Sequence, residues 1–135
     1  MPRFAIALMA LALAACQPPA ATLDPNAEPI ARQFFDEVRT GADLEASPHL
    51  AHELKNPTTE EQLAELRSQI PLEPPRSVTL TSWDAKTETI GTTTHLTQAY
   101  AYADRTLVVR TAFFKSPNGQ DPVIIGFTIT SDTAS

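Results

Sequence analysis

The residues best suited to bind or activate a small molecule lie in a segment rich in threonine and aromatic residues, about 93–103. Gln98, Tyr100 and Tyr102 are separated from one another by single alanines. Residues two apart in a strand point to the same face, so these side chains should share a face with Leu96. We expect that face to pack on helices, which directs both phenols toward the interior or its mouth. A phenol there can donate to an oxyanion or to a ligand's polar edge, or it can be a core aromatic whose hydroxyl reaches the rim.

Two further side chains are candidates for a ligand site, although the pattern does not fix the faces from which they project. Trp83 either belongs to the core or contacts a ligand, and Arg110 either pairs with an acidic strand neighbour or meets an anionic ligand. A catalytic tyrosine would need a nearby proton acceptor. Asp84 and Asp104 are candidates, but both lie toward strand ends, where solvated turn roles are expected. We therefore assign no catalytic residue.

The histidines give weak signals for metal binding. His95 alternates with Leu96 and so should face away from the interior, at the surface or at a dimer face. His49 and His52 are three apart on an expected helix, a spacing that can place one metal ion between two side chains. No additional Cys or His completes such a site, so we expect both histidines to lie on a solvated helix face. We expect neither a metal nor a cofactor.

The single cysteine ends the longest apolar run of the chain. Arg3 precedes a run of apolar residues over 4–15, which is shorter than the roughly 20 residues that a membrane-spanning helix needs. The end of this run, Leu13-Ala14-Ala15-Cys16, resembles the lipobox of bacterial lipoproteins. The resemblance implies cleavage before Cys16 and lipidation of its sulfur. The alternative is an ordinary signal peptide that ends at an incidental cysteine.

The same resemblance predicts the location of the protein and the organisation of the chain. Residues 1–15 are expected to be a lipoprotein signal peptide, 16–26 the lipidated cysteine and a proline-containing flexible tether, and 27–131 a single α+β domain. Gln17, which stands where an aspartate would be the retention signal, implies transfer to the outer membrane, on its periplasmic face. The net charge of −6 and the lack of a basic cluster argue against nucleic acid as a partner.

The first half of the domain is expected to be helical. Ile30, Phe34 and Val38 are spaced by four and predict a helix from about residue 27 that stops at Gly41. A second, less regular helical stretch is expected over 43–54, with a new helix that starts at its internal proline. A third helix is expected up to residue 70. Its capping box would be formed by Thr58 and Glu61.

The second half reads as strands, because threonine, valine, isoleucine and aromatic residues dominate it. We expect strands over 77–88, 93–103, 106–115 and 122–130. Their short connections allow only antiparallel neighbours, so they should form a meander. The third strand has apolar residues on both faces, which predicts helices on one side and suggests a dimer partner on the other.

Two stretches carry a resemblance to a known superfamily. "ARQFFDEVRTGADLEA" resembles the first helix and turn of nuclear transport factor 2-like domains, and "VIIGFTIT" resembles the closing strand of small exported members. The likeness covers about 27–130. It implies an α+β fold in which three N-terminal helices pack on a curved four-stranded antiparallel meander to form a cone, with space for a ligand between sheet and helices.

These observations lead to one expected function and two alternatives. The chain is expected to be a membrane-anchored periplasmic lipoprotein that binds a small apolar ligand or a protein partner and that is not an enzyme. One alternative is an isomerase, dehydratase or hydrolase that uses Tyr100, Tyr102 and an acid. The other is an envelope interaction or immunity protein without a pocket.

Overall fold

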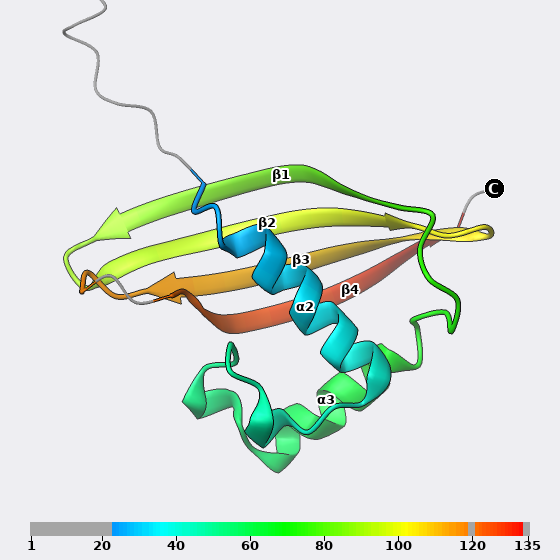
Figure 1. Ribbon diagram of the computed structural model, residues 1–135, viewed down its shortest axis with the longest axis horizontal. Coiled ribbons are helices and arrows are strands. Elements are labelled where there is room, and N and C mark those ends of the chain that lie inside the picture. Colours follow the sequence, from blue (N-terminus) through cyan, green and yellow to red (C-terminus); the bar gives the residue numbers. More distant parts are fainter. Residues whose placement is uncertain (1–22, 119–120, 134–135) are drawn as a thin grey trace, which may run out of the picture.

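Four long strands form the main feature of the computed structural model, which describes residues 23–118 and 121–133 (Figure 1). They pair antiparallel in chain order. The α+β class and the antiparallel meander are therefore confirmed. The last strand continues beyond its expected end at residue 130. The strands are β1 (Ser77–Glu88), β2 (Gly91–Ala101), β3 (Arg105–Lys115) and β4 (Val123–Thr133).

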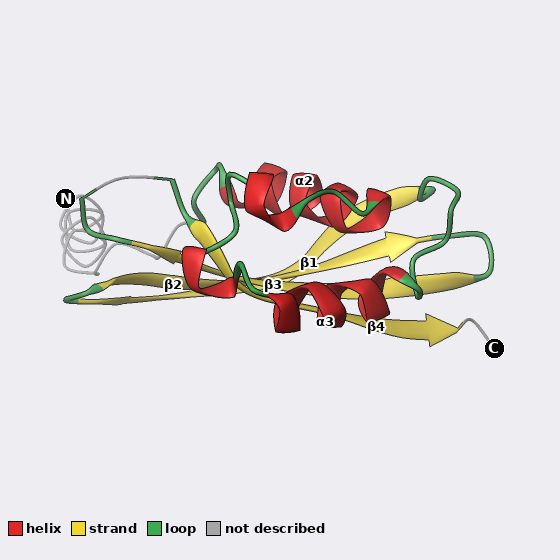
Figure 2. Ribbon diagram, turned by 90° about the horizontal axis from the view of Figure 1, so that it is seen from below, coloured by secondary structure: helices red, strands yellow, loops and turns green. Residues whose placement is uncertain are grey.

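The register of the strands fixes which side chains share a face of the sheet. Leu96 of β2 lies between Trp83 of β1 and Thr111 of β3, and all three side chains point to the same face. The pairing shifts between Leu80 and Ser82, and again between Ala112 and Phe113. Such irregularities increase the local twist, and the strands are visibly twisted against one another in Figure 2.

Helix α2 (Ala27–Thr40) crosses one face of the sheet (Figure 1). Its expected stripe of Ile30, Phe34 and Val38 is buried there. Gly41 ends the helix with φ 73°, a left-handed conformation that glycine adopts without steric cost. Both ends of this helix thus agree with the prediction.

Helix α3 (Pro57–Arg67) lies beside β4 and contacts α2 (Figure 1). The expected capping box is wrong, because the side chain of Asn56 caps this helix by accepting a hydrogen bond of 2.9 Å from the Thr59 amide. Pro57 then occupies the first turn, where its missing N–H costs nothing. The helix ends before residue 70, although Ile70 is buried.

The expected second helix over 43–54 does not form. Two 3₁₀ turns, η1 (Leu44–Ala46) and η2 (His52–Leu54), stand at its ends. Between them the chain runs along β4. The Ala51 amide donates to the Ile124 carbonyl at 2.9 Å, and the Ile124 amide donates to the His49 carbonyl at 2.7 Å. Pro48 disfavours a helical conformation at the preceding residue, so this segment satisfies its backbone on the sheet.

The core lies between α2 and one face of the sheet. Phe34, Leu96, Leu107 and Ile124 are fully enclosed there. The opposite face, which we call the outer face, is not covered by any residue in 23–118 or 121–133. The expected second cover of β3 is thus absent from the described chain.

The described chain enters the domain at the end of the sheet where β2 begins and β3 ends. The Lys115 ammonium donates to a carboxylate oxygen of Asp24 at 3.1 Å, and the Asn26 amide donates to the other oxygen at 2.9 Å. Leu23 packs against the core. The entry of the chain is therefore fixed to this end of the sheet.

No helix within residues 23–118 and 121–133 is long and apolar enough to cross a bilayer. The expected signal peptide over 1–15, Cys16 and the first part of the tether lie outside the described residues.

Candidate ligand-binding site

A row of polar side chains lies on the face of the sheet that packs against α2. Gln98 is 0 % exposed and Tyr100 is 3 % exposed, and they pair in register with Val109 and Leu107 of β3. Tyr102, one residue beyond β2, is also buried at 6 %. Gln98 and Tyr100 therefore share the face of Leu96, as the alternation predicts, and all three predicted side chains point away from bulk solvent.

None of these polar groups has a hydrogen-bond partner within the described chain. The unpartnered atoms include both carboxamide atoms of Gln98 and the hydroxyls of Tyr100 and Tyr102. The buried hydroxyl of Thr111, diagonally across from Gln98, is unpartnered as well. Buried polar groups in proteins almost always have partners, because an unsatisfied group costs about 1–3 kcal/mol. Of these groups, Tyr100 lines the cleft described below.

Sequence reasoning missed Thr111 although the signal was present. Thr111 lies between Val109 and Phe113 in a strict alternation, and both neighbours are buried on the same face. The same period of two that selected the tyrosines therefore also places this hydroxyl in the interior.

A cleft of about 350 Å³ opens beside Tyr100, between α2, β1 and the segment that leads into β1. The Tyr100 ring stacks on Phe35 of α2, with ring centroids 4.0 Å apart. Such a volume suits a small organic ligand. The lining residues combine apolar walls with charged groups of α2: Arg32, Phe35, Asp36, Arg39, Pro74, Pro75, Val78 and Tyr100.

The phenols and arginines in and beside the cleft are hydrogen-bond donors. Burial raises the pKa of Tyr100 far above its ordinary value of 10.0, and burial also raises the pKa of Tyr102. Both phenols are therefore protonated donors at neutral pH. Arg32 donates to the Val78 carbonyl at 3.3 Å, and Nε of Arg39 donates to Asp36 at 3.0 Å. Neither arginine was singled out from the sequence.

Of the two remaining predicted residues, only Trp83 lies on the same face as the tyrosines. Trp83 is half-buried opposite Leu96 and packs against the core. Arg110 is exposed and pairs in register with Thr97 and Thr128 on the outer face. The sheet therefore separates Arg110 from the cleft.

The acids considered as proton acceptors do not approach the tyrosines. Asp84 Oδ1 lies 3.1 Å from His95 Nδ1 on the outer face, where both side chains are exposed. Asp104 lies in the turn after β2, and its hydrogen bond with Arg105, 3.0 Å long, lowers the pKa of this carboxyl. Neither carboxylate is placed for proton transfer with Tyr100.

His49 and His52 do not share a helix face, because the helix that would align them is replaced by an extended segment and a 3₁₀ turn. In the part of the chain that the structure describes, no group of three or more His, Cys, Asp or Glu is positioned to hold a metal ion.

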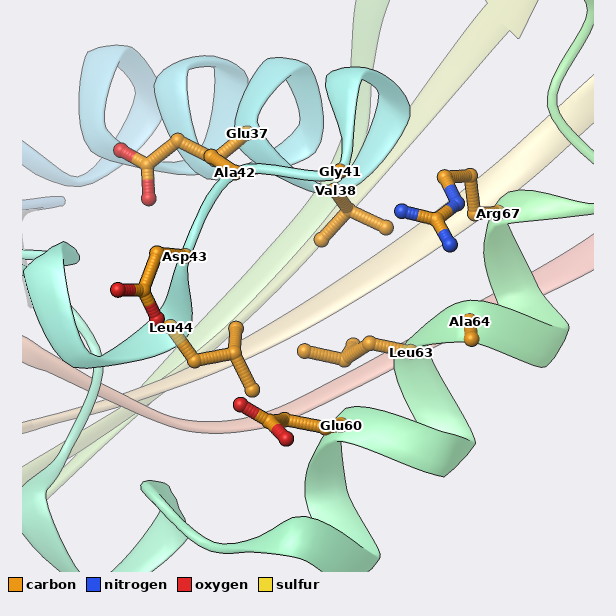
Figure 3. Close-up of a pocket in the computed structure, with 10 residues that line it drawn as sticks. All are labelled: Glu37, Val38, Gly41, Ala42, Asp43, Leu44, Glu60, Leu63, Ala64 and Arg67. Atoms are coloured by element: carbon orange, nitrogen blue, oxygen red, sulfur yellow. The ribbon is translucent and has the colours of Figure 1, made fainter.

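A second pocket, of about 220 Å³, lies under the carboxyl end of α2 (Figure 3). Arg67 of α3 points into it, so close to Gly41 that a Cβ there would lie 2.2 Å from the guanidinium. A cation in this position stabilises the negative end of the α2 dipole. The carboxylate of Glu37 accepts from the Ser47 hydroxyl at 2.7 Å. These groups are thus used to join α2 to α3 and to the intervening segment.

Comparisons with protein-family models, with curated proteins and with solved structures give no match for this chain. The description of the molecule therefore rests on its geometry. It is an α+β domain in which helix α2 covers one face of a four-stranded antiparallel sheet, with a donor-rich cleft where that helix meets the start of β1.

Proposed function

We propose that this protein is a lipid-anchored envelope protein whose domain binds a small, largely apolar ligand in the cleft beside Tyr100. The observation that supports this proposal is the cleft of about 350 Å³ beside Tyr100, whose buried hydroxyl has no hydrogen-bond partner among the described residues. A ligand that offers a hydrogen-bond acceptor to this hydroxyl would remove part of its desolvation cost on binding.

The proposed fold family is that of the nuclear transport factor 2-like domains. In this proposal α2, α3 and the sheet form the cone, and the segment with its two 3₁₀ turns replaces the second helix. The cleft would then be one entrance to the interior of the cone.

Ligand binding is tested by thermal shift on purified protein that carries Cys16→Ser, so that no lipid is attached. A ligand that binds only the folded state raises the midpoint by mass action. The Tyr100→Phe variant should lose most of the shift, because it removes a buried donor and keeps the ring that stacks on Phe35. Equal shifts in both proteins would argue against the cleft as the binding site.

We also propose that Cys16 carries the lipid and that the protein is held at the periplasmic face of the outer membrane. The support is the Leu13-Ala14-Ala15-Cys16 motif, followed by Gln17. Two or three acyl chains anchor a protein durably, whereas one does not. Incorporation of labelled palmitate should be abolished in the Cys16→Ser protein. Equal incorporation in the two proteins would contradict the anchor.

A second copy of the chain is our proposed cover for the outer face. Val108, Ala112 and Phe114 are only half-buried there. Strands of about 11 residues, four abreast, give a face of roughly 37 by 19 Å, so two copies would bury about 1,400 Å², the size of a standard interface. Val108→Glu should shift a dimer to monomers in sedimentation, whereas Gln33→Glu on the exposed side of α2 should not. A wild-type monomer at high concentration would contradict this proposal.

A further inference from the structure

The polar groups of the cleft beside Tyr100 are almost entirely donors. Arg32, Arg39 and Tyr100 carry N–H and O–H groups, and Asp36 is the one acidic side chain among the described residues that line the cleft. One carboxylate oxygen of Asp36, Oδ1, accepts hydrogen bonds from both Nε and a terminal nitrogen of Arg39. Glu28 lies 3.5 Å from Arg32, so the charges of the two arginines and the two carboxylates balance, and a ligand meets the remaining N–H donors of the arginines.

The two arginines differ in how firmly they are held. Arg39 forms its pair with Asp36 one turn away and has a side chain only 32 % exposed. Arg32 is 50 % exposed, and its contacts to Glu28 and to the Val78 carbonyl are 3.5 and 3.3 Å long. Charge-assisted hydrogen bonds in a well-formed pair are about 2.7–2.9 Å. Arg32 is thus the cation that can exchange its present weak contacts for a ligand.

The rest of the cleft is apolar. Phe35 and Tyr100 form a stacked pair on one side, and Pro74, Pro75 and Val78 form the other wall. Such walls contribute by burying hydrocarbon, at about 25 cal/mol per Å².

We propose that the ligand is a small amphipathic carboxylic acid, whose carboxylate binds Arg32 and the Tyr100 hydroxyl while its hydrocarbon part lies against Phe35 and the two prolines. This inference rests on the proposed function and specifies its ligand class. The chain as a whole carries a net charge of −6, but charges farther away than the screening length of about 8 Å contribute little at physiological salt. Contact with Arg32 therefore outweighs the overall repulsion.

The test compares two probes that differ in charge, 4-phenylbutyrate and 4-phenylbutan-1-ol, by calorimetric titration of the purified Cys16→Ser protein. The acid is expected to bind at least about ten-fold more tightly than the alcohol, because a hydrogen bond to a charged group is worth roughly twice a neutral one. Arg32→Gln should abolish this preference. Arg32→Lys should restore part of it.

The matched control is Arg110→Gln, which removes the same charge from the outer face and should leave the preference intact. Equal affinity of wild-type protein for both probes, or a preference that survives in Arg32→Gln, would overturn the assignment of the acid but not the cleft. Binding of neither probe would overturn the cleft as a ligand site, and with it the proposed function.

Discussion

Replacing Gln98 by methionine tests whether this buried, polar side chain lowers the stability of the free protein. The side chain is 0 % exposed, and neither of its polar atoms has a partner among the described residues. Methionine has a similar length and volume, so it fills the same space without leaving a cavity. The substitution therefore removes a desolvation cost while most packing contacts remain.

The expected gain follows from that cost. An unsatisfied buried polar group is unfavourable by about 1–3 kcal/mol, so the free energy of unfolding of Gln98→Met should rise by about this amount in the absence of ligand. For a domain of this size each kcal/mol corresponds to roughly 3–6 °C in Tm. Urea and thermal unfolding of the Cys16→Ser protein with and without Gln98→Met measure both quantities.

The control is Gln62→Met on α3, where the side chain is exposed. This change should alter the free energy of unfolding by less than about 0.5 kcal/mol. If Gln98→Met is instead less stable than the parent by more than about 1 kcal/mol, the carboxamide has a partner in the free protein, such as a buried water. The reasoning from unsatisfied groups to a ligand site would then fail.

Two further predictions concern the framework that holds the site. Gly91→Ala should destabilise the protein by at least about 1–3 kcal/mol, because φ is +149° and a Cβ would lie 2.4 Å from the Lys115 carbonyl, whereas Gly126→Ala, with its nearest contact at 3.4 Å, should be nearly neutral in urea unfolding. Comparable losses of stability in the two variants would contradict the clash expected at Gly91. The Asn26 amide and Lys115 lower the pKa of Asp24 below its ordinary value of 3.8, so the stability that this carboxylate adds is complete above that value and is lost as the pH falls through the lower folded pKa. Asp24→Asn should therefore be less stable than the parent at neutral pH, and the difference should disappear on acid titration followed by circular dichroism. Asp132→Asn is the control. A difference in stability between Asp24→Asn and the parent that grows as the pH falls would contradict a lowered pKa of Asp24.

Local patterns predicted the parts of the fold that depend on short-range periodicity. The stripe on α2 and the alternation around Gln98 and Tyr100 each repeat a simple period, and both select a buried face. The prediction of a helix over 43–54 was wrong because the backbone of this segment forms hydrogen bonds with Ile124, more than seventy residues further along the chain. A composition that tolerates a helix does not reveal a sheet edge that offers better partners.

The cleft itself could not be predicted by this reasoning. Arg32, Asp36 and Arg39 lie on the polar side of an amphipathic helix, and that pattern is typical of a solvated face. They become the wall of a cleft because Pro74 and Pro75 bring the chain back beside α2 before β1 begins. The position of Arg110 could not be predicted either, because only the pairing between strands decides that it lies on the opposite face from the tyrosines.

The attachment of Asp24 to Lys115 gives the domain a near end and a far end. Lys115 pairs in register with Thr92, and the cleft begins eight residues along β2 at Tyr100, so roughly 27 Å of strand lies between them. If the protein is held to a bilayer through the residues that precede Leu23, the cleft opens on the side farthest from that surface. Its occupant would then arrive from the surrounding water and leave into it, without crossing the lipid boundary.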